Sequence, residues 1–263
     1  MRPSFEERLA TVDANVAPML CMATDYAPDE RIARHAHRKH QLVYAVQGVM
    51  VVQAPAGQWV VPPTRAIWMP AGTVHSIRCI GAVHMRSLFV QPGFARALPA
   101  ELQVVSISPL LRELIQAVAA ISQPCAANSR EGRIQALILD ELRTLPVLPL
   151  HLPQPADPRI RKICERLNKH PDDDATLEDW AMRLKIAAKT IQRAFDRETG
   201  MTFGQWRQQI RLLRALERLA TGEKVLDVAL QLGYESPSAF ATMFKRQFGM
   251  TPSRFFEANA AEH

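Results

Sequence analysis

The chain has 263 residues, of which 48% are hydrophobic, so it is too long for one small domain and apolar enough to bury a sizeable core. Its 32 Lys and Arg residues against 26 Asp and Glu residues give a net charge of +6, which favours a polyanionic partner without identifying one. The four cysteines form no CxxC pair and no apolar run approaches ~18 residues, which argues against a disulfide framework and a membrane helix and predicts a soluble, cytoplasmic protein.

Residues 1–105 are expected to form the first domain. The residues before Gln41 predict a loose start, and from Gln41 to Phe89 short apolar runs of strand-like period alternate with turns that contain Pro and Gly. The dipeptide Gln47-Gly48 between two such runs predicts a β-hairpin. Because no helical segment separates the runs, the pattern predicts an antiparallel β-sandwich or barrel.

Three histidines in this region have the spacing of a ligand site. His35 and His37 are two residues apart in an extended segment, so their imidazoles face the same way. If His75 comes from a neighbouring strand, three nitrogens converge on one point and could hold a divalent metal with an open position. We expect His40 to face away from this point and His84 to be an ordinary strand histidine.

The residues around these histidines follow two short motifs. His35-Ala36-His37 is followed by Gln41 and, seven residues later, by Gly48, and His75 comes three residues after Pro70-Ala71-Gly72. This spacing resembles the cupin superfamily, whose first motif reads HxH, three residues, Glu, six residues, Gly, and whose second reads PxG, two residues, His. The resemblance implies a cupin-like barrel with a pocket at the histidines.

Two positions depart from the cupin pattern. Gln41 stands where the family has glutamate, and Cys79 where it has asparagine, so an anionic ligand is lost and a hard cation is held less strongly. Two interpretations stay open, namely a divalent metal on the three histidines, or a metal-free pocket in which they bind an effector or pack. The residues that we expect to line this effector pocket are His35, His37, Gln41, Tyr44, Trp68 and His75.

Helical periodicity returns at Ser106. Residues 106–146 carry two broad apolar stripes that predict a connector of two amphipathic helices, which could pack within one chain or pair with a second subunit in a homodimer. The proline-rich residues 147–156 cannot continue a helix and are interpreted as a semi-rigid spacer. Asp157-Pro158 then opens a further helical domain, which we expect over residues 157–258.

One folding unit is written twice in this last domain. Residues 177–184 match residues 225–232 at an offset of 48, and Phe195 and Gly200 match Phe244 and Gly249 at an offset of 49. Each copy predicts a short helix, a tight turn, a second helix and a glycine stop, which is the outline of a helix-turn-helix. Capping signals support both copies, because Thr176 has capping-box spacing to Asp179 and Ser236 precedes a proline.

A helix over Thr202–Leu219 is expected between the copies. Its apolar stripe is accompanied by a second row that consists of Arg207, Arg211, Arg214 and Arg218. This row could form a solvated face or contact the phosphate backbone of a nucleic acid.

The turn, glycine and core residues of both copies match a known family. They are Ile191-Gln192-Arg193-Ala194-Phe195, Glu198-Thr199-Gly200, Val228-Ala229, Gly233-Tyr234-Glu235-Ser236, Phe240, Phe244-Lys245, Phe248-Gly249 and Thr251-Pro252. With the cupin-like sensor and the helical connector, the chain resembles the AraC/XylS family of bacterial transcription regulators. The resemblance implies an α+β multidomain protein in which a cupin-like β-barrel, a helical connector and an all-α domain with two helix-turn-helix units follow one another.

The resemblance also implies the function and the partners. We expect a sequence-specific transcriptional regulator, an activator or a repressor, whose DNA binding or activation a small-molecule effector modulates. Its expected partners are a double-stranded DNA operator, RNA polymerase and, if the connector pairs, a second copy of the chain. The effector, the operator and the target genes stay open.

The second helix of each unit is expected to enter the major groove. In the first unit we expect Ala188, Lys189, Gln192 and Arg193 to face DNA, with Gln192 suited to adenine and Arg193 to guanine. A phosphate contact or an ion pair within the domain is the alternative role for Arg193. The second unit offers Pro237, Ser238, Ala241 and Thr242, which are small and mostly apolar, so the first unit should carry more of the sequence discrimination. Lys245 and Arg246 are expected to meet phosphates.

The rival hypothesis is a metal-dependent cupin enzyme, an oxygenase or isomerase, with an accessory helical domain. The three histidines permit this chemistry. The missing glutamate, the lack of a nearby acid–base pair and the complete DNA-reading unit weigh against it, so we expect a regulator and not an enzyme. A constitutive architectural protein that bends DNA without any effector is a third hypothesis.

Overall fold

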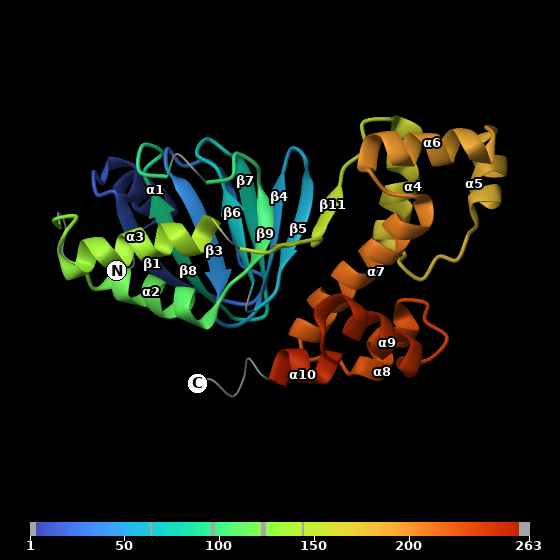
Figure 1. Cartoon of the computed structure of the whole chain (residues 1–263). Helices are drawn as coiled ribbons and strands as arrows, with labels where there is room; N and C mark the ends of the chain where they lie inside the picture. The colour runs from blue at the N-terminus through green and yellow to red at the C-terminus, as the bar shows by residue number, and fades with distance from the viewer. Residues whose placement is uncertain (1–3, 64, 96–97, 122–124, 144, 258–263) are drawn as a thin grey trace. The chain divides into compact units, whose positions relative to one another are not determined.

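The computed structural model describes residues 4–63, 65–95, 98–121, 125–143 and 145–257, and its contacts divide the chain into two compact units (Figure 1). The described residues up to Pro149, apart from Pro55–Val60, form the first, which we call the sheet unit. Pro55–Val60 and the described residues from Leu150 form the second, the helical unit. The main division thus falls inside the predicted spacer. The predicted domain end at residue 258 lies outside the described residues.

Eleven described strands form two antiparallel sheets. The first sheet has the order β1 (Met19–Tyr26), β8 (Val83–Val90), β3 (His40–Ala45), β6 (Arg65–Met69), β9 (Gln103–Ser106) and β10 (Val147–Leu148). The second has the order β11 (His151–Pro153), β5 (Gly57–Val61), β4 (Val49–Ala54), β7 (His75–Ile80) and β2 (Arg31–His35). The predicted antiparallel β architecture of the N-terminal part is confirmed.

Strands β3 and β4 do not form the predicted hairpin. They belong to different sheets, so Gln47-Gly48 crosses from one sheet to the other. Gly48 has a φ of +81°, and a Cβ atom there would overlap the carbonyl oxygen of Ala82 and lie 2.7 Å from Cγ2 of Val83. The alternation of apolar residues identifies the strands but not their partners, because both strands are buried on both faces.

The start of the chain is helical where we expected it to be loose. Helix α1 (Phe5–Ala14) begins at a capping box, in which the Ser4 hydroxyl accepts from the amide of Glu7 and the Glu7 carboxylate accepts from the amide of Ser4. At its other end the ammonium of Lys39, only 1% exposed, donates to the carbonyls of Val12 and Asn15. The Ser-x-x-Glu spacing is the sequence signal that this expectation missed.

The two predicted connector helices are present as α2 (Pro109–Ala119) and α3 (Arg130–Arg143). They lie along the first sheet (Figure 1) and share a hydrophobic core with it. The sheet contributes Leu42, Tyr44, Trp68 and Leu88, and the helices contribute Leu111, Ile115, Val118, Ile138, Leu139 and Leu142. Burial of these side chains fixes both helices to the sheet, while Leu110 and Leu137 keep 49% and 40% of their surface exposed.

The residues interpreted as a spacer contain two short strands. β10 pairs with β9, and β11 pairs with β5, where His151 stacks on Trp59 at a ring-centroid distance of 4.3 Å. Each lies at the end of its sheet, a position at which proline is tolerated because the outer edge needs no amide donor. The prolines therefore end helix α3 without making the segment a free linker.

The helical unit confirms the predicted pair of helix-turn-helix motifs (Figure 1). Its helices are α4 (Pro158–Lys169), α5 (Leu177–Leu184), α6 (Ala188–Thr199), α7 (Phe203–Ala220), α8 (Val225–Gln231), α9 (Pro237–Phe248) and α10 (Pro252–Glu257). The predicted capping box of Thr176 and Asp179 starts α5, and Ser236 caps α9. Gly200 and Gly249 end α6 and α9 in the left-handed conformation.

Within the part of the chain that the structure describes, no helix combines the length and the apolar character that a membrane crossing requires.

Replacing Gly48 by Ala should destabilise the protein more than replacing Gly72 by Ala. Their φ values of +81° and +79° give both substitutions a similar backbone cost of about 1–2 kcal/mol. Around Gly72 no described heavy atom beyond its chain neighbours lies within 4 Å of an added Cβ. The overlap with Ala82 should therefore cost Gly48→Ala a further ~1–3 kcal/mol of unfolding free energy. Hydrogen exchange of the β3 and β4 amides measures both costs, and equal losses would contradict the close approach at the crossing.

Candidate functional site

Helices α6 and α9 each follow a turn with one residue in the left-handed region. Lys185, which caps the C-terminus of α5, has a φ of +54°, and Gly233, after α8, has a φ of +73°. A non-glycine residue in this region is uncommon, so the Lys185 turn is held by its surroundings. Its amide donates to α5 carbonyls, and Ile186 donates to the carbonyl of Ala181. Both turns reverse the chain between two helices, as a helix-turn-helix requires.

The predicted reading residues of α6 lie on its outward side. Lys189 and Arg193 are exposed, and Ala188 and Gln192 are half-buried. The Gln192 side-chain amide donates to the carboxylate of Asp196 over 3.1 Å, one helical turn further on. Asp196, which our sequence analysis left out, therefore orients the Gln192 amide; the i, i+4 spacing of the pair is the signal that could have found it.

The predicted residues of α9 are also accessible. Ser238, Thr242, Lys245 and Arg246 are exposed, and Pro237 and Ala241 are half-buried. Opposite them, Phe240 and Phe244 are buried in the core. Both second helices thus present a continuous outward face, and the role of each residue on it stays a prediction.

The arginine row of α7 forms neither a solvated face nor a free phosphate-binding face. All four guanidinium groups have partners in the helical unit. Arg207 donates to the carbonyls of Asp174 and Ala175, Arg211 to those of Pro171 and Gly233, Arg214 to Glu217 and Asn168, and Arg218 lies 3.7 Å from a carboxylate oxygen of Glu223. The acceptors of Arg207 and Arg211 come from the loop before α5 and the turn after α8, which a helical period cannot reveal, whereas Glu217 lies on α7 three residues after Arg214.

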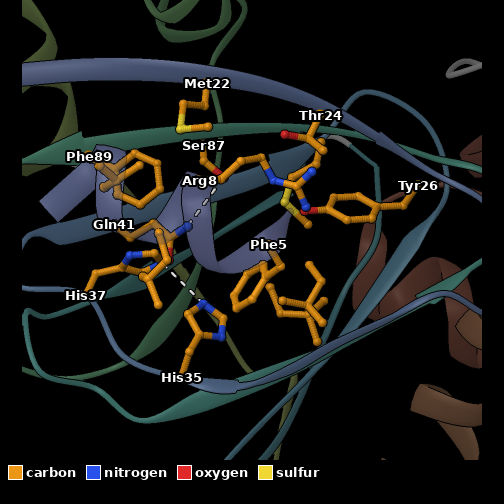
Figure 2. A pocket seen from close by; sticks show the side chains of 15 residues that line it. Phe5, Arg8, Met22, Thr24, Tyr26, His35, His37, Gln41, Ser87 and Phe89 are labelled. Atoms are coloured by element: carbon orange, nitrogen blue, oxygen red, sulfur yellow. Dashed lines mark hydrogen bonds between the residues drawn. The ribbon is translucent and has the colours of Figure 1, made fainter. Parts of the chain in front are cut away.

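A small cavity of about 40 Å³ lies within the sheet unit (Figure 2). Strands of both sheets line it, and α1 supplies Phe5, Arg8, Leu9 and Val12. Figure 2 shows Phe5 near His35 and the Arg8 side chain extending towards Tyr26, and Phe89 on β8 lies beside His37. No carboxylate is among the described lining residues. The part played by α1 was missed because the helix itself was not expected.

The three predicted histidines converge. His75 lies opposite His35 in the β2–β7 register, and Nε2 of His37 lies 3.2 Å from Nε2 of His35. One nitrogen from each of the three rings can be chosen so that all lie within 4.8 Å of one another. The predicted geometry of the cluster is therefore present.

The main chain assigns the tautomers of two of these histidines. Nδ1 of His35 lies 2.8 Å from the carbonyl oxygen of Ala33, and Nδ1 of His75 lies 2.9 Å from that of Thr73. Because a carbonyl oxygen only accepts, both Nδ1 atoms carry hydrogen and both Nε2 atoms keep a lone pair. The short contact then makes Nε2 of His37 the donor to His35.

Burial keeps the cluster neutral. Desolvation, reinforced by the neighbouring imidazoles, lowers the pKa of His37 to about 3. Desolvation also lowers the pKa of His75 to about 4 and depresses the pKa of His35. At neutral pH the cavity therefore offers uncharged imidazoles, which is the form that binds metals and polar ligands.

The donor set fits a divalent transition metal. Among the described residues, Nε2 of His75, Nδ1 of His37 and Oε1 of Gln41 are buried without a hydrogen-bond partner. Imidazole nitrogens suit such an ion, and the Gln41 oxygen could add a neutral ligand where a carboxylate is missing. The same unpartnered atoms also fit the polar groups of a small molecule, because a buried polar atom without a partner costs about 1–3 kcal/mol.

Tyr44 and Trp68 do not line the cavity, so their assignment to the pocket is wrong. His75 is not among the described lining residues either, but its ring lies 4.3 Å from that of His35, which does line the cavity. Gln41 points into the cavity, and side chains alternate along a strand, so Tyr44 three residues later points to the opposite face. Trp68 lies opposite Leu42 in the β3–β6 register and shares that outer face. Both belong to the core beneath α2 and α3.

Two other histidines lie where we expected them. The His40 ring stacks on Trp68, and its Nδ1 accepts a hydrogen bond from the amide of Ala71, away from the cluster. His84 on β8 pairs with Asp25 on β1 over 2.9 Å. Neither contributes to the cavity.

Comparisons with known proteins match both halves of the chain. Residues 17–145 match the family described as the AraC-like ligand binding domain, and residues 180–258 match a helix-turn-helix domain family. The HTH-type transcriptional regulator NimR of Escherichia coli K12 is 38% identical over 221 residues, which are 84% of this chain and 81% of NimR. Regulatory protein SoxS of Salmonella typhimurium is 33% identical over 36% of this chain and 91% of SoxS. The solved structure of ToxT from Vibrio cholerae aligns with 91% of this chain and 98% of its own at 12% identity, with a TM-score of 0.38.

The stability of the metal-free protein should fall as the pH falls from about 6.5 to about 4. An unfolded histidine has a pKa of about 6.5, so the unfolded chain takes up protons that the folded His37 and His75 exclude. Each of the two groups then contributes up to ~1.4 kcal/mol per pH unit, lost on acidification.

Urea unfolding in a chelator at several pH values measures this slope. The double variant His37→Gln, His75→Gln removes both titrations and should flatten it, whereas His84→Gln, outside the cavity, should not. A parent slope unchanged in the double variant would contradict buried, neutral imidazoles.

Proposed function

Since this chain belongs to the AraC-type family of helix-turn-helix transcriptional regulators, we propose that α6 and α9 read its operator and that a small molecule in the cavity of the sheet unit modulates this binding. The observation that carries the proposal is the repeated motif with two accessible second helices in one unit. Because the relatives are named transcription regulators and a complete DNA-reading unit is present, the enzyme hypothesis is not retained.

The first motif carries most of the sequence discrimination in this proposal. Arg193 can donate two hydrogen bonds to guanine, and Gln192 can both accept from and donate to adenine. The bond to Asp196 uses one amide hydrogen of Gln192, so the other hydrogen and the oxygen are left for a base. On α9, Thr242 and Ala241 offer a methyl surface for thymine, and Lys245 and Arg246 supply charge to phosphates.

The effector is a small molecule that is not a cation. The cavity has aromatic and aliphatic walls, neutral imidazoles and one guanidinium group, that of Arg8. An apolar body with a polar group that hydrogen-bonds His37, His75 or Gln41 would satisfy the buried atoms that have no partner. The volume of the cavity, about 40 Å³, is enough for only a few water molecules. A larger effector enters by moving the α1 side chains aside.

Strand β3 gives the cavity a path to the connector helices. It carries Gln41 into the cavity and Leu42 and Tyr44 into the core beneath α2 and α3. An effector that binds more tightly to one position of β3 therefore also favours the packing of α2 and α3 that goes with that position. Modulation requires that the two packings differ in their affinity for the effector.

A divalent metal on His35, His37 and His75 is the second candidate for the cavity. The unpartnered Nε2 of His75 and Oε1 of Gln41 favour it. When bound, such an ion would supply an open position for a ligand atom of the effector. In that case the effector would bind to the metal and not directly to the histidines.

Two further partners belong to this proposal. The exposed Leu110 and Leu137 on the connector helices support pairing with a second copy of the chain. RNA polymerase is the expected partner in activation, and transcription from the operator in a purified system tests this. Sedimentation of the full chain with and without operator tests the dimer.

Arg193→Ala should lose more base discrimination than Thr242→Ala. The parent operator is obtained by selecting bound duplexes from a random pool, and each variant is then measured against single-base substitutions of it. Loss of a bidentate guanine contact should cost about 1–3 kcal/mol at one position, and loss of a methyl contact less. A larger loss of discrimination with Thr242→Ala would reverse the assignment of the two motifs.

His35→Ala and His75→Ala should weaken the response of operator affinity to an effector. Operator affinity is measured with the small-molecule fraction of a cell extract, with zinc chloride and with a chelator. An additive that changes the operator affinity of the parent about tenfold should leave the affinity of either variant almost unchanged. His84→Ala, outside the cavity and not on β3, is the matched control and should respond like the parent. Variants of both histidines that respond like the parent would overturn the pocket, and a response to zinc alone would identify the metal.

A further inference from the structure

We infer that Arg211, in the middle of α7, is the positioning residue that fixes the spacing between the two DNA-reading motifs. The inference rests on the proposed use of α6 and α9 and adds how their separation is held. Two operator grooves can be read together only if the two helices keep the separation of one duplex turn, ~34 Å. The chain must therefore hold two small motifs rigidly, although each has a core of its own.

The aromatic contacts show the two cores. Phe195 packs against Phe203 and Trp206 at the start of α7, with ring-centroid distances of 5.6 and 6.4 Å. In the second motif Phe244 packs against Phe240 and Phe255, at 5.8 and 5.5 Å. The 18 residues of α7, which begins in the first cluster and leads to the second motif, span ~27 Å. A helix of this length sets a distance, but side chains must fix how each motif is turned about it.

Arg211 contacts the loop that leads into the first motif and the turn of the second motif at once. Its Nε donates to the carbonyl of Pro171, in the loop from α4 to α5, over 2.7 Å. Its Nη1 donates to the carbonyl of Gly233, in the turn from α8 to α9, over 3.4 Å. The guanidinium also lies 5.9 Å from the ring centroid of Tyr234 in the same turn. The fixed fork of donors in an arginine suits two acceptors that come from different loops.

The two loops also approach each other directly beside this side chain. A Cβ at Gly233 would lie 3.1 Å from the carbonyl oxygen of Asp172 and 2.9 Å from Nη2 of Arg211. With a φ of +73°, Gly233 is also in a conformation that other residues adopt at a cost. The turn of the second motif is therefore seated against the loop of the first, with Arg211 bonded to both.

Other arginines of the same row bind within one motif. Arg207, one turn earlier, donates to the carbonyls of Asp174 and Ala175 and lies over the Phe203 ring, all on the side of the first motif. Arg218 lies near Glu223, which precedes α8. Arg207 is therefore a matched control, because it makes the same kind of bond to the same loop without reaching the second motif.

Arg211→Lys tests the inference in the full chain. A lysine keeps the charge but has a single ammonium in place of the fork. The probes are the selected operator, the same duplex with one base pair inserted or removed between its half-sites, and a duplex with one half-site. We expect the preference for native spacing to fall about tenfold, with half-site affinity changed less than about twofold. Arg207→Lys should keep the preference of the parent.

Gly233→Ala provides an independent second variant. Its added methyl group pushes the turn away from Asp172, so the preference for native spacing should fall as it does in Arg211→Lys. If Arg211→Lys does not unfold cooperatively and is therefore misfolded, Gly233→Ala tests the inference in its place. An unchanged spacing preference would overturn the inference. So would an equal loss on the half-site and on the whole operator, which shows a merely structural role. A parent chain that selects no sequence at all would instead overturn the proposed function.

Discussion

The helical unit depends on one geometric constraint, namely that two recognition helices on a single chain must match the repeat of the DNA duplex. α7 supplies the distance between the motifs, and its position is set at the start by a capping box of Thr202 and Gln205. Bonds from its arginines to main-chain carbonyls then hold the loops on either side. Each such bond contributes only about 0.5–1.5 kcal/mol, but fully satisfied hydrogen-bond networks make the structure around them more rigid. Arginines for which the sequence suggested phosphate contacts instead donate hydrogen bonds to main-chain carbonyls within the unit.

A second constraint acts in the sheet unit, where polar atoms are buried without compensation. Two of the three neutral imidazoles, those of His35 and His37, line a small cavity together with the Gln41 amide, and side chains of α1 form part of its wall. The same short segment of chain serves both purposes, because His37 faces the cavity while the ammonium of Lys39 holds the end of α1. Lys39 therefore anchors the end of α1 two residues away from His37. The uncompensated atoms lower the cost of binding a ligand that pairs with them.

Local signals predicted the parts of the fold that local physics decides. The doubled motif, the caps at Thr176 and Ser236 and the left-handed glycines are set by groups within a few residues, so the sequence shows them. The predicted hairpin at Gln47-Gly48 was wrong, because tertiary contacts and not local sequence decide which strands pair. The prediction that Tyr44 lines the pocket was wrong for a simpler reason, since side chains alternate along a strand and Tyr44, three residues after Gln41, lies on the opposite face. The acceptors of Arg211 lie 40 and 22 residues away along the chain, which no spacing rule brings together.

The central claim is that one chain places α6 and α9 in successive major grooves of one operator. Methylation interference on the selected duplex tests it most directly, because a methyl group on N7 of guanine blocks contact in the major groove alone. The account predicts two windows of interference on the same face of the duplex, with centres about 10 base pairs apart. A single window, or two windows on opposite faces, would contradict it.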